Sequence, residues 1–152
     1  MTDGTQAAIG LRLERTFDAP RDEVFDAWTN PEVMRRWWAA GRDWSTPLAE
    51  VDLREGGRYR LSMHNPENDE THTVAGEYRE VKRPAKLVYT WLWETDPEPN
   101  ESVVTVEFHD RGGATDVVLV HEGLASEQSR EAHEHGWVGV LENLKLRVFP
   151  GA

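Results

Sequence analysis

The C-terminal stretch Ser126–Phe149 has the pattern of one long amphipathic helix. With about 100° of rotation per residue, its apolar positions form a stripe along one side, while His135 falls on the opposite, polar side. The stripe consists of His133, Trp137, Val140, Leu141, Leu144 and Val148. Because such a helix must bury its stripe against another layer, the rest of the chain has to supply an apolar surface of matching length.

Two glycines, Gly136 and Gly139, lie along one edge of this stripe. Each costs about 1 kcal/mol relative to alanine in a helix interior, so both need a structural reason. One interpretation is that a sheet packs very close to the helix backbone there. The other is that the missing side chains leave room for a small molecule.

The surface that covers the helix is predicted by the stretch Leu48–Gly123. Apolar residues alternate there and turn signals recur about every ten residues, which predicts a meander of about six antiparallel strands. Tight turns are expected at Gly56-Gly57 and at Gly112-Gly113. A further strand is expected at the start of the chain, over Ala8–Phe17.

Two short helices are expected between the first strand and the meander. The first covers Pro20–Thr29, because proline is tolerated at the first helical position. The second follows Asn30 as its N-cap and ends near Trp37-Trp38. The next segment, Ala39–Pro47, is predicted to be a loop, although it carries Trp44.

The expected fold class is therefore α+β, with a curved antiparallel sheet wrapped on a long C-terminal helix and two short helices after the first strand. Large sheets twist, so a helix across one leaves gaps, and ligand pockets commonly form in such gaps. We expect one domain over residues 8–149, a disordered N-terminus over residues 1–7 and a short tail over residues 150–152.

Charge and composition argue against several classes of partner. The chain has 17 Lys and Arg against 28 Asp and Glu, and its net charge of −11 disfavours nucleic acid and anionic lipid surfaces. Cysteine is absent, which excludes disulfides and thiolate metal clusters. Without a signal-peptide pattern or a long apolar run, we expect a cytoplasmic protein with no membrane insertion, as a monomer or homodimer.

Aromatic residues are the main candidates for a ligand site. Tyr89, Trp91 and Trp93 share one face of an expected strand, and these rings either line a cavity or fill the core. Trp38 and Trp44 are expected either at the mouth or lid of the cavity or as plain plugs of the loop that carries them. The candidate ligand-binding residues are Trp38, Trp44, Tyr59, Leu61, Met63, Tyr78, Tyr89, Trp91, Trp93, Phe108, His121, His133, Trp137 and Leu141.

His121 and His133 are the candidate catalytic residues, because both are expected to point inward. Two imidazoles near a cavity either bind a ligand and shuttle a proton, or are core residues satisfied by backbone carbonyls. No metal site is expected, since His133 and His135 point about 200° apart on a helix. No cofactor is expected, because the phosphate-loop and dinucleotide motifs are absent.

Several short motifs occur together in an order that resembles a known superfamily. They are Phe17-Asp18-Ala19-Pro20, Val24-Phe25-Asp26-Ala27-Trp28-Thr29-Asn30-Pro31, Trp37-Trp38, Glu55-Gly56-Gly57, Gly76-Glu77-Tyr78, Pro84, Leu87-Val88-Tyr89-Thr90-Trp91, Thr105-Val106, Thr115, Val120-His121-Glu122-Gly123 and Gly136-Trp137. From about Leu11 to Val148 the chain resembles the START-like (SRPBCC) superfamily, in the branch named for homology to the activator of heat-shock-protein ATPase.

The resemblance implies a helix-grip (START-like, Bet v 1-like) fold with a cavity between the sheet and the C-terminal helix. The superfamily uses this cavity for lipids, sterols, polyketides and other apolar ligands. We therefore expect a small-molecule-binding protein whose partner is a small apolar or aromatic molecule. The alternatives are a cyclase, dehydratase or hydrolase acting on a polyketide-like substrate, and a stress or chaperone accessory acting by protein interaction.

Overall fold

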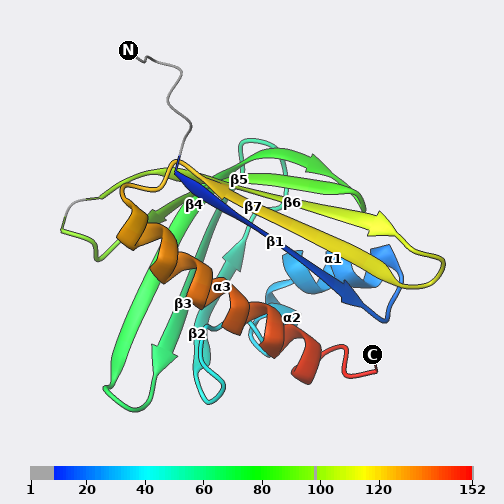
Figure 1. The fold of residues 1–152 in the computed structure, drawn as a ribbon, viewed down its shortest axis with the longest axis horizontal. Coiled ribbons are helices and arrows are strands. Elements are labelled where there is room, and N and C mark those ends of the chain that lie inside the picture. The colour runs from blue at the N-terminus through cyan, green and yellow to red at the C-terminus, as the bar shows by residue number, and fades with distance from the viewer. Residues whose placement is uncertain (1–8, 98, 152) are drawn as a thin grey trace.

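Seven antiparallel strands form one sheet in this computed structural model, which describes residues 9–97 and 99–151 (Figure 1). The strand order is β1-β7-β6-β5-β4-β3-β2. The strands are β1 (Gly10–Phe17), β2 (Ser45–Val51), β3 (Arg58–Asn65), β4 (Glu70–Lys82), β5 (Lys86–Trp93), β6 (Ser102–Asp110) and β7 (Thr115–Glu122). The N-terminal segment 1–7, predicted to be disordered, lies outside the described residues.

The described residues also form three helices: α1 (Arg21–Thr29), α2 (Pro31–Met34) and α3 (Glu127–Arg147). The long helix α3 crosses the curved sheet, and α1 and α2 lie behind it toward one end (Figure 1). The predicted α+β class, the curved sheet and the order of elements are thereby confirmed. The sheet bends because adjacent strands twist, and α3 lies across the concavity that results.

Helix α3 begins where the sequence indicates. The Ser126 side chain is the N-cap and accepts a hydrogen bond from the Ser129 amide at 3.0 Å. The predicted stripe is buried at Trp137, Val140, Leu141 and Leu144. Asn143 is also buried, which the apolar pattern did not predict.

The boundaries around the short helices differ from the predictions. Pro20 is the N-cap of α1 rather than its first residue, and α2 is a single turn that ends at Met34 instead of near Trp38. Trp37 and Trp38 are both 1% exposed, and neighbours 100° apart on a helix do not bury equally well against one layer. The chain therefore leaves the helix to bury both rings.

The loop predicted over Ala39–Pro47 is too long. Strand β2 already begins at Ser45, which pairs with His64 of β3 before a register shift near Leu48. This irregularity, together with Pro47 on the edge strand, hides the alternation that would have marked the strand.

One end of the interior is filled by aromatic rings. Trp28 packs against Trp37 and Phe108, with ring centroids 5.0 and 5.9 Å apart. Next to them, Tyr59 packs edge-on against Tyr89 at 5.2 Å and donates a hydrogen bond to the Thr90 carbonyl at 2.5 Å. This part of the molecule is a packed core that holds α1 on the sheet.

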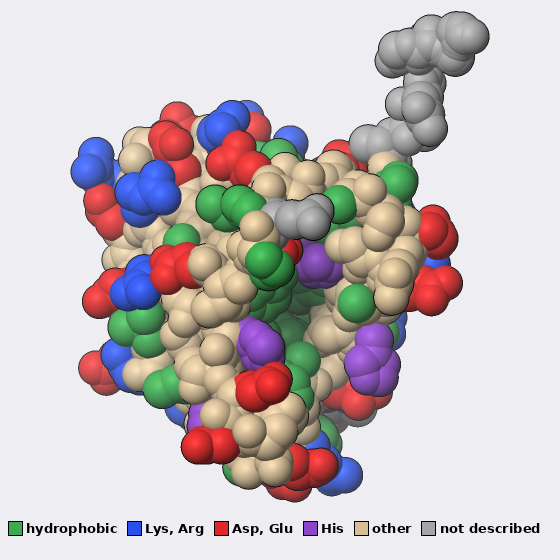
Figure 2. All heavy atoms as spheres, turned by 90° about the vertical axis from the view of Figure 1, so that its left-hand side faces the viewer, with side chains coloured by type: hydrophobic (Ala, Val, Ile, Leu, Met, Phe, Trp, Pro, Cys, Tyr) green, Lys and Arg blue, Asp and Glu red, His purple; other side chains and the backbone are tan. Residues whose placement is uncertain are grey.

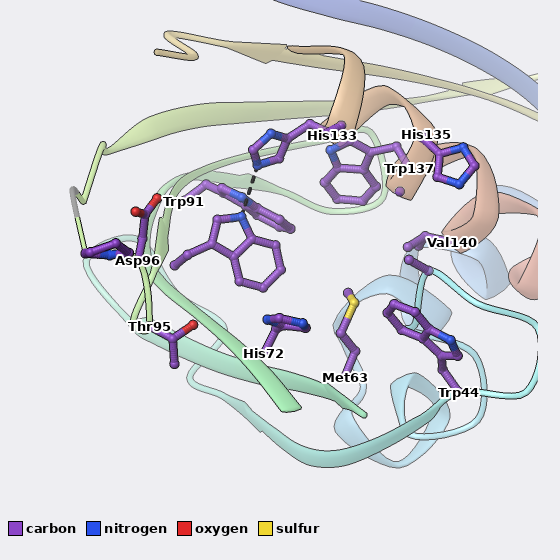
Figure 3. A pocket seen from close by; sticks show the side chains of 15 residues that line it. Trp44, Met63, His72, Trp91, Thr95, Asp96, His133, His135, Trp137 and Val140 are labelled. Atoms are coloured by element: carbon purple, nitrogen blue, oxygen red, sulfur yellow. Dashed lines mark hydrogen bonds between the residues drawn. The ribbon is translucent and has the colours of Figure 1, made fainter. Parts of the chain in front are cut away.

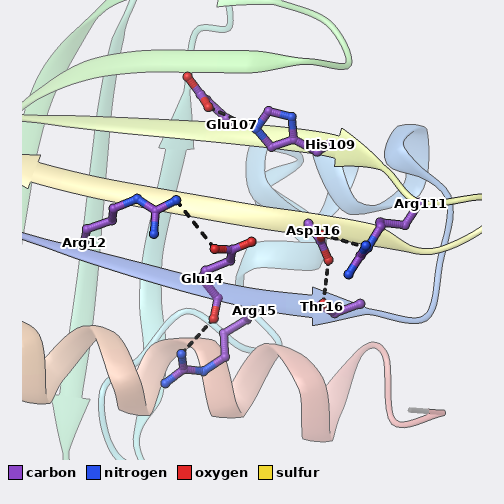
Figure 4. Close-up of polar contacts among 8 residues, drawn as sticks. All are labelled: Arg12, Glu14, Arg15, Thr16, Glu107, His109, Arg111 and Asp116. Carbon is purple, nitrogen blue, oxygen red and sulfur yellow. Dashed lines mark hydrogen bonds and ion pairs between the residues drawn. The ribbon is translucent and has the colours of Figure 1, made fainter.

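The opposite face of β1, β7 and β6 carries polar contacts (Figure 4). The Asp116 carboxylate accepts from the Thr16 hydroxyl at 2.5 Å and pairs with Arg111 at 2.8 Å. Glu107 pairs with His109 at 3.0 Å. These carboxylates lie on the outer face of the sheet, away from α3. The exposed Glu107–His109 pair contributes little to stability, whereas Asp116 is only 9% exposed and is satisfied by its two contacts.

The two glycines of α3, Gly136 and Gly139, have different surroundings, so each is explained by a different structural requirement. A Cβ on Gly139 would lie 1.8 Å from the Ala40 carbonyl oxygen, whereas a Cβ on Gly136 would meet only the Ala40 methyl group at 3.9 Å. The interpretation that a sheet approaches the helix here is wrong, because the close neighbour is the loop around Ala40. Gly139 permits that contact, and Gly136 leaves open space.

Alanine substitutions should separate these two roles. We expect Gly139→Ala to lower the free energy of unfolding by about 1–3 kcal/mol, because its methyl group would overlap the Ala40 carbonyl. Gly136→Ala should raise it by about 0.5–1 kcal/mol, because helix propensity improves without a clash. Urea unfolding of both variants measures this, and equal effects of the two substitutions would contradict the assignment.

Candidate functional site

An open cavity of about 490 Å³ lies between α3 and the sheet (Figures 2 and 3). Strands β3, β4 and β5 form one wall, α3 forms the other, and the loops around Ala40 and Thr95 complete the rim. Its lining is Ala40, Trp44, Met63, His72, Trp91, Trp93, Thr95, Asp96, Pro97, Ala132, His133, His135, Gly136, Trp137 and Val140. Figure 2 shows apolar side chains in the depth of this hollow and histidines near it.

The C-terminal half of α3 is fixed by the loop that follows Trp38. The buried Asn143 amide donates to the carbonyls of Ala39 and Gly41, both at 2.9 Å. Because a side-chain amide nitrogen carries two donors, this one residue satisfies two loop carbonyls at once. The contact holds the loop against α3 beside Gly139 and sets the distance between the helix and the cavity rim.

The N-terminal half of α3 is fixed to the sheet through Trp137 and His121. The Trp137 indole N–H donates to Nδ1 of His121 at 3.0 Å, so this nitrogen is the acceptor and the His121 proton is on Nε2. The Nε2 atom of His121 lies 2.7 Å from the Ser102 hydroxyl oxygen, and its N–H donates to that oxygen. His121 is thus fully hydrogen-bonded as a neutral imidazole.

A second pair repeats this arrangement at the cavity wall. The Trp93 indole N–H donates to Nε2 of His133 at 3.0 Å, as the dashed line in Figure 3 shows. The Nδ1 proton of His133 then points to the Ser129 carbonyl at 2.8 Å. This pair connects the end of β5 to the first turns of α3.

Burial controls the charge of His121. Its side chain is 0% exposed, and desolvation, followed by repulsion from nearby His133, lowers its pKa to about 3. The ring centroids of His121 and His133 are 5.0 Å apart, so the structure brings the predicted pair together. However, all four ring nitrogens are engaged in hydrogen bonds within the protein, and two of these bonds join α3 to the sheet. This geometry fits a positioning role better than proton transfer.

The structure divides the predicted ligand residues into two groups. Six line the cavity: Trp44, Met63, Trp91, Trp93, His133 and Trp137. The others do not line it and are buried in the packed interior: Trp38, Tyr59, Leu61, Tyr78, Tyr89, Phe108, His121 and Leu141. The expectation of Trp38 at the mouth is wrong, because its ring packs against Trp91 inside the core.

Some lining residues were missed by the sequence reasoning. His72 pairs with Met63 across the β3–β4 hairpin, and a symmetric hairpin register would have placed it on the same face. His135 was assigned to the polar side of α3, but the cavity is wider than the buried stripe. Thr95, Asp96 and Pro97 belong to an acidic turn that gave no signal of its position.

Two further kinds of site are absent from the described part of the chain. No group of three or more His, Asp or Glu side chains there is arranged to hold a metal ion. No helix there is long and apolar enough to cross a membrane.

Comparisons with known proteins place the chain in context. The sequence pattern of the family described as Activator of Hsp90 ATPase homolog 1-like protein matches residues 18–148. The human Activator of 90 kDa heat shock protein ATPase homolog 1 is 20% identical over 127 residues, which are 84% of this chain and 33% of that protein. The chain thus spans about a third of the length of the curated relatives it matches.

Solved structures are similar over nearly the whole chain. A protein from Chromobacterium violaceum aligns with a TM-score of 0.82 at 23% identity, covering 90% of this chain and 94% of that one, which shows the fold. An AHSA1 protein from Silicibacter pomeroyi aligns with a TM-score of 0.79 at 27% identity, covering 91% of this chain and 96% of that one. An HSP90 activator from Plasmodium falciparum aligns with a TM-score of 0.71 at 26% identity, covering 91% of this chain and 94% of that one.

The lowered pKa of His121 makes stability depend on pH. Below about pH 6.5 the unfolded chain binds a proton at this residue that the folded protein excludes down to about pH 3, so stability falls as the pH falls through this window. Between pH 7 and 5.5 this effect should lower the free energy of unfolding by about 1 kcal/mol.

His121→Gln keeps an acceptor and a donor at this position but does not titrate, so it should lack that loss. Urea unfolding of both proteins at the two pH values measures the difference. An equal loss in the wild-type protein and in His121→Gln would show that His121 is not held neutral by the fold.

Proposed function

The chain belongs to the family of Activator of Hsp90 ATPase homolog 1-like proteins, and we propose that it binds a small apolar molecule in the cavity beside Gly136. The observation that supports this most directly is the open cavity of about 490 Å³, a size typical of small-molecule sites. A cytoplasmic location, as a monomer or homodimer, is part of the proposal.

The lining supports an apolar ligand. Met63 from the sheet faces Val140 and Trp137 from α3 (Figure 3), and Trp93 lines the same cavity. A flat molecule in this space would therefore contact hydrocarbon and ring surfaces. Gly136 widens the space where a larger side chain would close it. The helix thus gives up stability at a position where the cavity gains volume.

A neutral fluorescent probe tests the proposal. N-phenyl-1-naphthylamine should bind the wild-type protein with an increase in fluorescence, because burial removes it from water. Gly136→Leu should weaken its binding at least about tenfold by filling the cavity. Glu142→Leu adds a similar side chain at an exposed position of α3 and should leave binding unchanged.

Either of two results would contradict the proposed site. One is wild-type protein that does not bind the probe. The other is Gly136→Leu that binds as well as the Glu142→Leu control. Circular dichroism of the three proteins confirms that they are equally folded.

A second candidate function comes from the relatives. The human and mouse proteins matched by this chain are named as activators of the 90 kDa heat shock protein ATPase, and one structural neighbour is an HSP90 activator. We propose as the alternative that this chain assists such a chaperone.

An ATPase assay tests this alternative. Added in equimolar amount to an Hsp90-type ATPase, the chain should raise the ATP hydrolysis rate at least about twofold, which lowers the activation free energy by about 0.4 kcal/mol. An unchanged rate would count against this role.

A further inference from the structure

One buried donor at the cavity has no hydrogen-bond acceptor. The Trp91 side chain is 4% exposed, and its indole nitrogen has no partner among the described residues. The neighbouring indole N–H groups of Trp93 and Trp137 both donate to histidine nitrogens at 3.0 Å. Because buried polar groups are nearly always paired, the unpaired N–H of Trp91 indicates a place for an acceptor that the protein does not provide.

Trp91 lies where two cavities meet. It lines the cavity described above and also a second one, of about 350 Å³, that extends toward Ser102 and Leu124. Both cavities also share Trp93 and His133. The hydrogen-bonded Trp93–His133 pair, like Trp91, therefore lies where the two spaces adjoin.

A ligand atom reaches the Trp91 nitrogen only if a neighbouring ring moves. Trp93 is suited to this, because it is half-buried, packs edge-on against Trp91 at 5.3 Å and is held to α3 by its hydrogen bond to His133. The other close ring, Trp137, is 3% exposed and is tied to the buried His121. Displacement of Trp93 would join the two cavities and open the way to the donor.

The charge of the lining indicates what kind of acceptor fits. The described lining contains no Lys or Arg, and its ionisable side chains are His72, Asp96, His133 and His135. An anion would thus enter a lining that offers it no permanent positive charge, in a chain of net charge −11. A neutral oxygen, such as a ketone or amide carbonyl, avoids this repulsion.

We propose that the cavity takes a neutral ring-containing molecule with a carbonyl group, and that the indole N–H of Trp91 donates the hydrogen bond that recognises its oxygen. This inference rests on the proposed function, because it assumes that an apolar ligand occupies this cavity. Trp91 is then a specificity-determining residue, and Trp93 is the ring that moves to admit the ligand.

Three probes of similar size test the inference on the wild-type protein. They are fluorene, 9-fluorenone and fluorene-9-carboxylate, which share a ring system and differ in the group at one carbon. We expect 9-fluorenone to bind about tenfold more tightly than fluorene, and the carboxylate to bind more weakly than either. Without a donor at the site, the ketone should bind no better than fluorene, because its oxygen loses hydrogen bonds to water. Calorimetric titration measures the three affinities.

Matched variants assign the preference to one nitrogen. Trp91→Phe keeps a ring but removes the N–H, so the ratio of fluorenone to fluorene affinity should fall to about one. Trp44→Phe makes the same change elsewhere in the lining and should keep the tenfold ratio. A ratio that persists in Trp91→Phe, or a wild-type protein that binds fluorene and 9-fluorenone equally, would overturn the inference.

The failure of this inference can be told apart from failure of the proposed function. Binding of fluorene and of N-phenyl-1-naphthylamine without any preference for the ketone leaves the apolar site intact and removes only the role of Trp91. No binding of any probe removes both. Should Trp91→Phe not fold, the wild-type indole N–H resonance of Trp91 decides: 9-fluorenone should move it downfield, as a new hydrogen bond does, and fluorene should not move it downfield.

Discussion

Helix α3 is held at a fixed distance from the sheet by polar contacts on both sides of a gap. On one side Asn143 binds two carbonyls of the loop around Ala40, next to Gly139. On the other side, two indole–imidazole hydrogen bonds connect α3 to the sheet. Because these contacts require defined distances, the helix cannot settle further onto the sheet, and apolar packing alone would otherwise close the space.

The same contacts explain why histidines occur in an apolar region. Each imidazole accepts from one tryptophan and donates to an oxygen, so both nitrogens of each ring are hydrogen-bonded within the protein. The rings that line the cavity are therefore positioned by hydrogen bonds as well as by packing. The fixed ring of Trp137 favours binding, because little of its side-chain entropy remains to be lost when a ligand enters, whereas the half-buried Trp93 is the ring that the proposed ligand displaces.

The sequence predicted the larger features and missed those that depend on three-dimensional contacts. Alternation and capping residues located the strands and α3, since these signals are local. Asn143 was missed because a polar residue within a helix gives no sign of a distant loop carbonyl. Trp38 and Trp44 looked alike in the sequence, but only the structure distinguishes the core ring from the lining ring.

The central claim is that the space between α3 and the sheet is a binding site, and the most direct measurement is the location of a bound probe. Intermolecular nuclear Overhauser effects should connect N-phenyl-1-naphthylamine to methyl groups on opposite walls, Met63 on β3 and Val140 on α3. Contacts from the same bound molecule to both walls are the predicted result. Binding with contacts only to exposed groups such as Leu146, 53% exposed on the far part of α3, would contradict the account.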